Sequence, residues 1–138
     1  MQIAVHAAFM LMPESDGSDF ERLRTYVRDM PPAQFSFTVC TPSPGTDDYA
    51  AMRDEMWTGD AFDLHDCMHP LTPTKLPLRQ FCKLYAEQVR EAGTKNPRRA
   101  ARVPVHPADM ARVIRAQWGY ERAFENIYRD YPRELWGV

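Results

Sequence analysis

The run Phe35-Ser36-Phe37-Thr38-Val39-Cys40, which passes directly into Thr41-Pro42-Ser43-Pro44-Gly45-Thr46, decides the fold of this chain of 138 residues. The first half is strand-like. In open α/β proteins, loops such as the second half follow the carboxyl ends of parallel strands, and ligands bind at these loops. The two prolines fix φ and remove two N–H donors, the glycine permits a sharp turn or close approach to a ligand, and Thr46 can cap a following helix. Spacing alone slightly favours a plain strand-to-helix turn.

The residues before this loop predict a βαβ unit. Residues 3–12 are mostly apolar, which is typical of a strand buried on both faces. Residues 18–30 are expected to form a helix, because apolar residues recur at helical spacing and Ser18 and Glu21 have capping-box spacing. The order predicts that residues 3–12 and 35–40 are adjacent parallel strands joined by a right-handed crossover.

The rest of the chain is predicted to be mainly helical. Its segments are a short helix over 47–56, an irregular proline-rich stretch over 57–77, a helix over 78–92, a polar and basic link over 94–105, and a last helix from Pro107 that ends by Pro132. Its aromatic tail, with Tyr120 and Phe124 among others, is expected to lie in the core. We therefore divide the chain into an α/β part over 1–56 and an irregular and helical extension over 57–138.

Three groups of side chains are candidates for binding. His65-Asp66-Cys67-Met68-His69 is the densest cluster of metal-ligand types, but its spacing matches no strong metal motif, which favours polar groups bonding local backbone. Glu14 follows Pro13 at the end of the first strand, where ligand binding and simple solvation are equally supported. Lys75 could place a cation near a ligand, although a solvated lysine beside a helix cap is favoured. No metal site is expected, and the catalytic residues stay unknown.

Composition limits the classes of partner. The net charge of −2 gives no general reason to expect nucleic acid or an anionic membrane as partner, and Arg98-Arg99-Ala100-Ala101-Arg102 is interpreted as a solvated linker. Cys40, Cys67 and Cys82 are odd in number and far apart, which argues against a disulfide framework and against an iron–sulfur cluster held by this chain alone. No run is long enough to span a bilayer. We expect a cytoplasmic location.

These segments together resemble the C-terminal part of a radical S-adenosylmethionine (radical SAM) enzyme. Residues 5–14 resemble the fifth barrel strand of that family and its Pro-Glu turn, and residues 37–46 resemble the sixth strand and its Thr-Pro-x-Pro-Gly-Thr loop. Residues 63–70 and 73–77 resemble the cobalamin-binding subgroup. Within that subgroup the ending, residues 128–137, is similar to that of the hopanoid C-3 methylases.

The resemblance implies a partial radical-SAM-type barrel that serves a cobalamin-dependent methyltransferase acting on hopanoid lipids. It implies S-adenosylmethionine, a 4Fe-4S cluster and cobalamin as cofactors, the last two not bound by this chain alone. The cofactor-binding residues carried over from the family's loops are Glu14, Thr41, Pro42, Gly45 and Thr46. The substrate-binding residues carried over are His65, His69 and Lys75.

This chain also departs from the family. The three-cysteine cluster motif and the cobalamin domain, which lie upstream in the family, are missing here, and residues such as Ala7, Ala8 and Met12 replace the glycines of the fifth strand. The implied partners are an upstream catalytic half or partner chain and a hopanoid lipid, with peripheral membrane contact through that substrate and no nucleic acid. The alternative is a non-catalytic binding or interaction module, or a truncated gene product.

Overall fold

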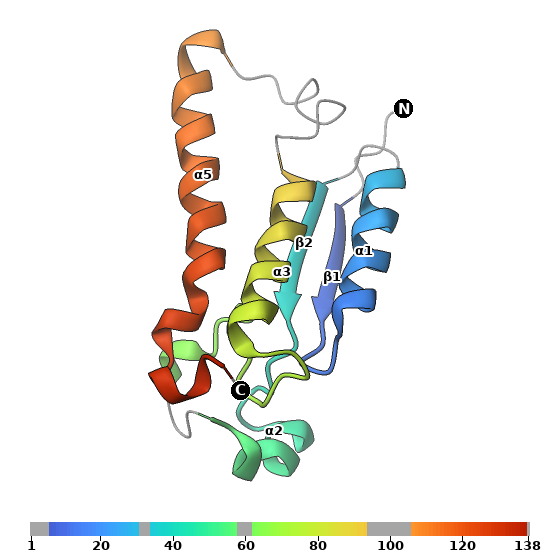
Figure 1. The fold of residues 1–138 in the computed structure, drawn as a ribbon, viewed down its shortest axis with the longest axis vertical. Coiled ribbons are helices and arrows are strands. Elements are labelled where there is room, and N and C mark those ends of the chain that lie inside the picture. Colours follow the sequence, from blue (N-terminus) through green and yellow to red (C-terminus); the bar gives the residue numbers. More distant parts are fainter. Residues whose placement is uncertain (1–5, 31–33, 58–61, 94–105, 138) are drawn as a thin grey trace.

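A computed structural model describes residues 6–30, 34–57, 62–93 and 106–137 as a small α/β unit followed by helices (Figure 1). The helices and strands are β1 (His6–Leu11), α1 (Gly17–Asp29), β2 (Gln34–Val39), α2 (Asp47–Met52), α3 (Leu78–Ala92) and α5 (Met110–Asn126). Short 3-10 helices cover Arg53–Glu55, Phe62–Leu64, Pro107–Asp109, Ile127–Asp130 and Arg133–Leu135. The predicted α/β class is confirmed. The expected 94–105 link and residues 3–5 of the first strand lie outside the described residues.

β1 and β2 form a parallel pair, as the βαβ pattern predicted. The register runs from His6 opposite Gln34 to Leu11 opposite Val39, and α1 makes the crossover between the strands. The N–H of Cys40 continues the pairing, because it donates to the carbonyl of Leu11 at 2.8 Å. The carboxyl ends of both strands therefore lie at the same edge of the sheet.

α1 begins earlier than the sequence indicated. The capping box predicted at Ser18 and Glu21 is wrong; Asp16 is the N-cap, and its side chain accepts hydrogen bonds from the N–H groups of Ser18 and Asp19. The Asp19 carboxylate in turn accepts from the N–H of Asp16 at 2.9 Å. A carboxylate at this position also interacts favourably with the positive end of the helix, which a serine cap does not offer to the same degree.

One face of the sheet is covered by α1 and α3. Phe9 of β1 stacks on Phe35 and Phe37 of β2, with ring centroids 6.0 and 5.7 Å apart. The buried core that continues from this face consists of Leu11, Phe20, Val27, Phe37, Val39, Leu78, Phe81, Cys82, Tyr85, Ala86, Val89, Phe124, Ile127, Tyr128 and Tyr131. α3 has the bounds that the sequence predicted. The expectation that the aromatic tail lies in the core is confirmed for Phe124, Tyr128 and Tyr131, Trp136 is half-buried against that core, and the expectation is wrong for Tyr120, which is 51% exposed.

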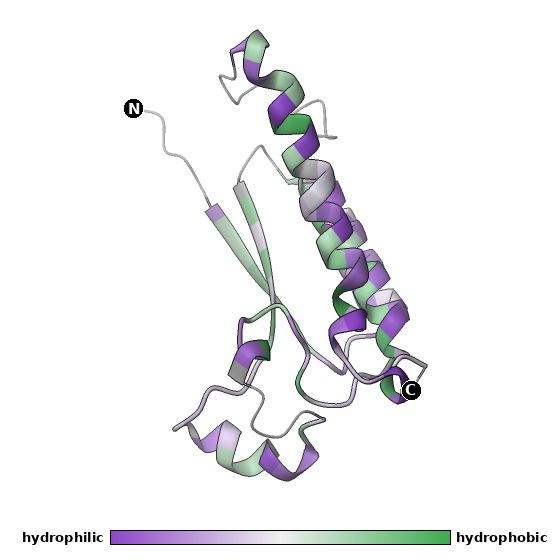
Figure 2. Cartoon of the chain, turned by 90° about the vertical axis from the view of Figure 1, so that its left-hand side faces the viewer, coloured by the Kyte–Doolittle hydropathy of each residue, from purple (hydrophilic) through white to green (hydrophobic). Residues whose placement is uncertain are grey.

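The opposite face of the sheet is open. His6, Ala8 and Met10 of β1 are exposed, and Met10 keeps 63% of its surface accessible. Figure 2 shows the helices on one side of the two strands, with no described element over the other side. The prediction that the first strand is buried on both faces is therefore wrong for this chain, because a single crossover helix and α3 cover only one face.

The last helix, α5, packs on α3 through its carboxyl-terminal half. The rings of Tyr85 and Phe124 meet edge to face at 4.7 Å, and Arg90 Nε lies 3.2 Å from Glu121 Oε2. Pro107 occupies the first turn of the 3-10 helix that leads into α5. The α-helix ends at Asn126, before Pro132, and passes into a 3-10 turn.

Candidate functional site

Two turns that the sequence singled out lie at the carboxyl edge of the sheet. Glu14, which is exposed, follows the end of β1, and the Thr41–Thr46 loop follows the end of β2. Burial, reinforced by the negative charges of Glu14 and Asp48, raises the pKa of the Cys40 thiol. The two carboxylates are thus near enough to Cys40 to influence the charge of its thiol.

The Thr41–Thr46 loop is held mainly by its own hydroxyl groups. Thr41 Oγ1 lies 3.2 Å from the carbonyl oxygen of Val39 and 3.3 Å from that of His69, so its one proton can serve either acceptor. Thr46 Oγ1 donates to the carbonyl of Ser43 at 2.7 Å and accepts from the N–H of Tyr49 at 3.2 Å, which confirms it as the cap of α2.

The loop also depends on its proline and glycine. Pro42 is buried, and Gly45 has a φ of 88°, in the left-handed region that glycine adopts without steric cost. Residues 43–46 of the loop are exposed to solvent. Contact between this loop and a cofactor stays a prediction.

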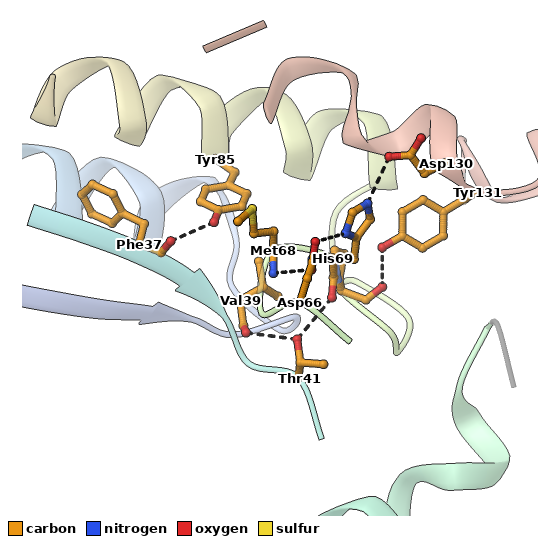
Figure 3. Close-up of polar contacts among 10 residues, drawn as sticks. Phe37, Val39, Thr41, Asp66, Met68, His69, Tyr85, Asp130 and Tyr131 are labelled. Atoms are coloured by element: carbon orange, nitrogen blue, oxygen red, sulfur yellow. Dashed lines mark hydrogen bonds and ion pairs between the residues drawn. The ribbon is translucent and has the colours of Figure 1, made fainter. Parts of the chain in front are cut away.

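His69 is fixed between two carboxylates (Figure 3). Its Nδ1 lies 2.9 Å from Asp66 Oδ2, and its Nε2 lies 3.1 Å from Asp130 Oδ2. Only 8% of the residue is exposed. Both ring nitrogens are engaged within the chain, and substrate binding by His69 stays a prediction.

Asp66 organises the turn that carries His69. Its Oδ1 accepts from the N–H groups of Met68 and His69 at 2.8 and 3.0 Å. Burial acts to raise the pKa of Asp66, but the hydrogen bonds from the His69 ring and from these N–H groups outweigh it and lower that pKa. The expectation that polar groups of this cluster bond local backbone is confirmed for Asp66.

This turn is hydrogen-bonded to the outer edge of β2 at Val39, the last residue of the strand. The N–H of Cys40 points to β1, so the N–H of Val39 points away from β1, and it donates to the carbonyl of Cys67 at 2.7 Å. Cys67 has a φ of 60°, which is uncommon for a residue with a side chain. A tight turn thus stands where a further strand would otherwise form its first hydrogen bond.

The carboxyl-terminal segment holds the same turn from the other side. The hydroxyl of Tyr131 donates to the carbonyl of Pro70 at 2.8 Å, and its ring meets Trp57 edge to face at 6.0 Å. Sequence reasoning missed the part played by Asp130. No local signal could reveal it, because Asp130 lies 61 residues from its partner His69.

The other two predicted substrate residues have neighbours different from those of His69. The ring of His65, which is half-buried, has its centroid 6.0 Å from that of Tyr49 in α2. Lys75 is exposed; its Nζ lies 2.8 Å from Asp16 Oδ2, and its N–H donates to the carbonyl of Pro13 at 2.9 Å. This ion pair lowers the pKa of Asp16 and raises that of Lys75. Lys75 therefore lies beside the turn that carries Glu14.

The thiols do not gather into a ligand set for an iron–sulfur cluster. Cys40 is half-buried, Cys67 is exposed, and Cys82 is buried in α3, where burial raises its pKa to about 12. Within the described ranges, no group of three or more His, Cys, Asp or Glu side chains could hold a metal ion. A cluster of the radical SAM type does not fit the described residues of this chain alone.

Comparison of the chain with family models, with curated proteins and with solved structures found no match. The resemblance to radical SAM enzymes therefore depends on the sequence segments named above. Of the helices that the structure describes, none has the length and apolar character needed to cross a membrane.

Proposed function

We propose that this chain is the C-terminal portion of a cobalamin-dependent radical SAM methyltransferase that acts on a hopanoid lipid, and that it forms part of the barrel wall. The observation that carries the proposal is the register of β1 and β2. It sets the turn with Glu14 and the Thr41–Thr46 loop beyond the carboxyl ends of adjacent parallel strands. In barrels and open α/β sheets, this is the edge where ligands bind.

The open face of the sheet also supports a barrel. In a barrel of parallel strands the helices lie outside, and the other face of each strand lines the interior. Here α1 and α3 lie on one side, while Ala8 and Met10 on the other side are exposed in this chain alone. Further strands from an upstream catalytic half would pair with the sheet and enclose that face.

In this proposal the chain binds and orients S-adenosylmethionine. The Glu14 carboxylate accepts hydrogen bonds from the ligand's amino group, and the exposed backbone of the Thr41–Thr46 loop lies against the ligand. His65, His69 and Lys75 are the candidates for substrate contact. The cluster and cobalamin would be held by the upstream half, because the described thiols of this chain do not form a ligand set.

The proposal is tested by supplying an upstream catalytic half in trans and measuring S-adenosylmethionine binding to the complex by equilibrium dialysis. Glu14→Ala should weaken binding by about 1–3 kcal/mol, because it removes a charged hydrogen-bond acceptor. Asp29→Ala is the matched control: Asp29 is also exposed, but it ends α1 at the opposite edge of the sheet. If the Glu14 variant and the control bind S-adenosylmethionine with equal affinity, Glu14 is not part of the binding site.

The alternative function, a non-catalytic binding or interaction module, predicts a different outcome. No complex with an upstream half would then bind S-adenosylmethionine, with or without Glu14. Sequencing of the gene separates the two further. An in-frame upstream segment with the cluster cysteines supports the enzyme, whereas a native stop codon before Met1 supports the module or a truncated product.

A further inference from the structure

The amino-terminal half of α5 presents an apolar surface to solvent. Met110, Ile114 and Trp118 are 43%, 39% and 56% exposed. Their spacing of four residues places them along one side of the helix. Figure 1 shows that this half extends well past the end of α3, whereas the carboxyl-terminal half packs on α3. We call Met110, Ile114 and Trp118 the α5 stripe.

Arginines border the α5 stripe. Arg115 precedes Trp118 by three residues and Arg122 follows it by four, so both are its neighbours on the helix surface, and both are exposed. Exposed Arg112 precedes Arg115 by a further three residues. An apolar side that includes tryptophan, next to a basic side, is the pattern of helices that lie in the interface of a membrane.

The charge of the whole chain is divided unevenly along the sequence. Residues 94–120 contain six lysine and arginine side chains and one acid, Asp109, which gives +5. The remaining residues contain 11 cations and 18 acids, which gives −7, so that the net charge of −2 conceals the asymmetry. Residues 94–120 are therefore the part of the sequence that a surface of negative charge would attract.

We propose that the amino-terminal half of α5 docks on an anionic phospholipid bilayer, with the α5 stripe in the interface and the arginines at the level of the phosphates. Anionic lipid fits better than a partner helix, because the stripe is narrow, contains tryptophan and is bordered by cations. This docking does not depend on the proposed methyltransferase function. It also differs from membrane contact through a lipid substrate, since it needs neither hopanoid nor S-adenosylmethionine.

Vesicle flotation with the full chain tests the proposal, because lipid-free aggregates do not float. The chain should float with vesicles of equimolar phosphatidylcholine and phosphatidylglycerol, and not with phosphatidylcholine alone. Replacing Ile114 and Trp118 together by serine should weaken partitioning at least about tenfold, through loss of buried apolar area. Arg115→Gln and Arg122→Gln should each weaken it about fivefold, and more added salt should weaken the wild type.

Met10→Ser is the control, since Met10 is more exposed than Trp118 but lies on the open face of the sheet. It should float like the wild type, and circular dichroism should show equal helix content in all variants. Several results would overturn the proposal: no flotation of the wild type, flotation that requires hopanoid in the vesicles, or equal loss in the Met10 control. Ultracentrifugation without lipid that shows a dimer lost only in the serine double variant, with no flotation, would instead identify a partner helix.

Discussion

The two faces of the β1–β2 sheet differ sharply in solvent exposure, although successive residues of the same two strands supply both faces. On the covered face, Phe37 and Val39 are 8% and 1% exposed beneath α1 and α3. On the open face, Met10 is 63% exposed (Figure 2). β1 is apolar on both faces, as are strands that lie between two layers. The comparison indicates that β1 has the composition of an interior strand, while the described chain supplies one layer.

The covered face should carry most of the stability, and Phe81→Ala tests this most strongly. Phe81 is fully buried in α3 and meets Phe20 edge to face at 5.3 Å. Its truncation should lower the free energy of unfolding by about 3–5 kcal/mol, through lost apolar burial and the cavity left behind. Urea denaturation measures the change. A loss below about 1 kcal/mol would mean that α3 is not the layer that stabilises the sheet.

Tyr85→Phe probes the polar attachment of α3 to the covered face. The Tyr85 hydroxyl donates to the carbonyl of Phe37 at 2.9 Å in a buried setting, and the ring would keep its packing on Phe124. The loss should be about 1–2 kcal/mol in urea denaturation, because the carbonyl is left without this donor. Tyr120→Phe is the control: its ring also meets Phe124, but the residue is 51% exposed. If both variants lose equally, the hydrogen bond contributes nothing measurable.

The turn at the outer edge of β2, where the two faces meet, should weaken in acid. The pKa of Asp66 is lowered in the folded chain, so the unfolded chain binds the proton more readily. The stabilisation from Asp66 is therefore present above its unfolded pKa of about 3.9 and is lost as pH falls through its folded pKa. Asp66→Asn should lower stability at neutral pH by about 1 kcal/mol, since the carboxylate is partly exposed.

Urea denaturation at a series of pH values measures this dependence. The Asp66→Asn variant should show a shallower decline of stability below about pH 4 than the wild type. The Asp63→Asn variant is the control, because Asp63 is an exposed acid of the preceding 3-10 helix. A decline of equal steepness in the Asp66 variant and the wild type would contradict the role of Asp66.

A substitution on the open face should change the stability of the chain least and its self-association most. Met10→Ser removes exposed apolar surface, so the free energy of unfolding should change by less than about 0.5 kcal/mol. The isolated wild-type chain is expected to associate through this face and the sheet edges, and the variant should associate less. Sedimentation velocity measures both. If the wild-type chain is a cooperatively folding monomer, that result would count against the proposal that further strands cover the open face.

Local patterns in the sequence were sufficient for most of the fold. The parallel βαβ unit, the bounds of α3 and the cap at Thr46 followed from periodicity, order and capping chemistry. The start of α1 was placed wrongly because Asp16 and Ser18 both offer cap oxygens, and the carboxylate also bonds Lys75 from a distant loop. Burial on both faces was expected from β1 alone, but burial depends on which other elements are present.

The candidate site was predictable only in part. The positions of Glu14 and the Thr41–Thr46 loop at one edge follow from strand direction. The contact of His69 with Asp130 does not, because no pattern of spacing links residues 61 apart. The exposed stripe of α5 was likewise concealed, since apolar residues at helical spacing look alike whether or not a neighbour covers them.

The contact between His69 and Asp130 has a consequence for the order of events during synthesis. A chain emerges from its amino terminus, so β1, β2 and the His69 turn are made well before Asp130 and Tyr131. Until those late residues fold back, the turn beside the carboxyl edge lacks two of its attachments. In nascent chains, and in products that stop before Asp130, the His69 turn beside this edge would therefore lack its contacts with Asp130 and Tyr131. Translation itself delays the ordering of the candidate site until Asp130 and Tyr131 have been made.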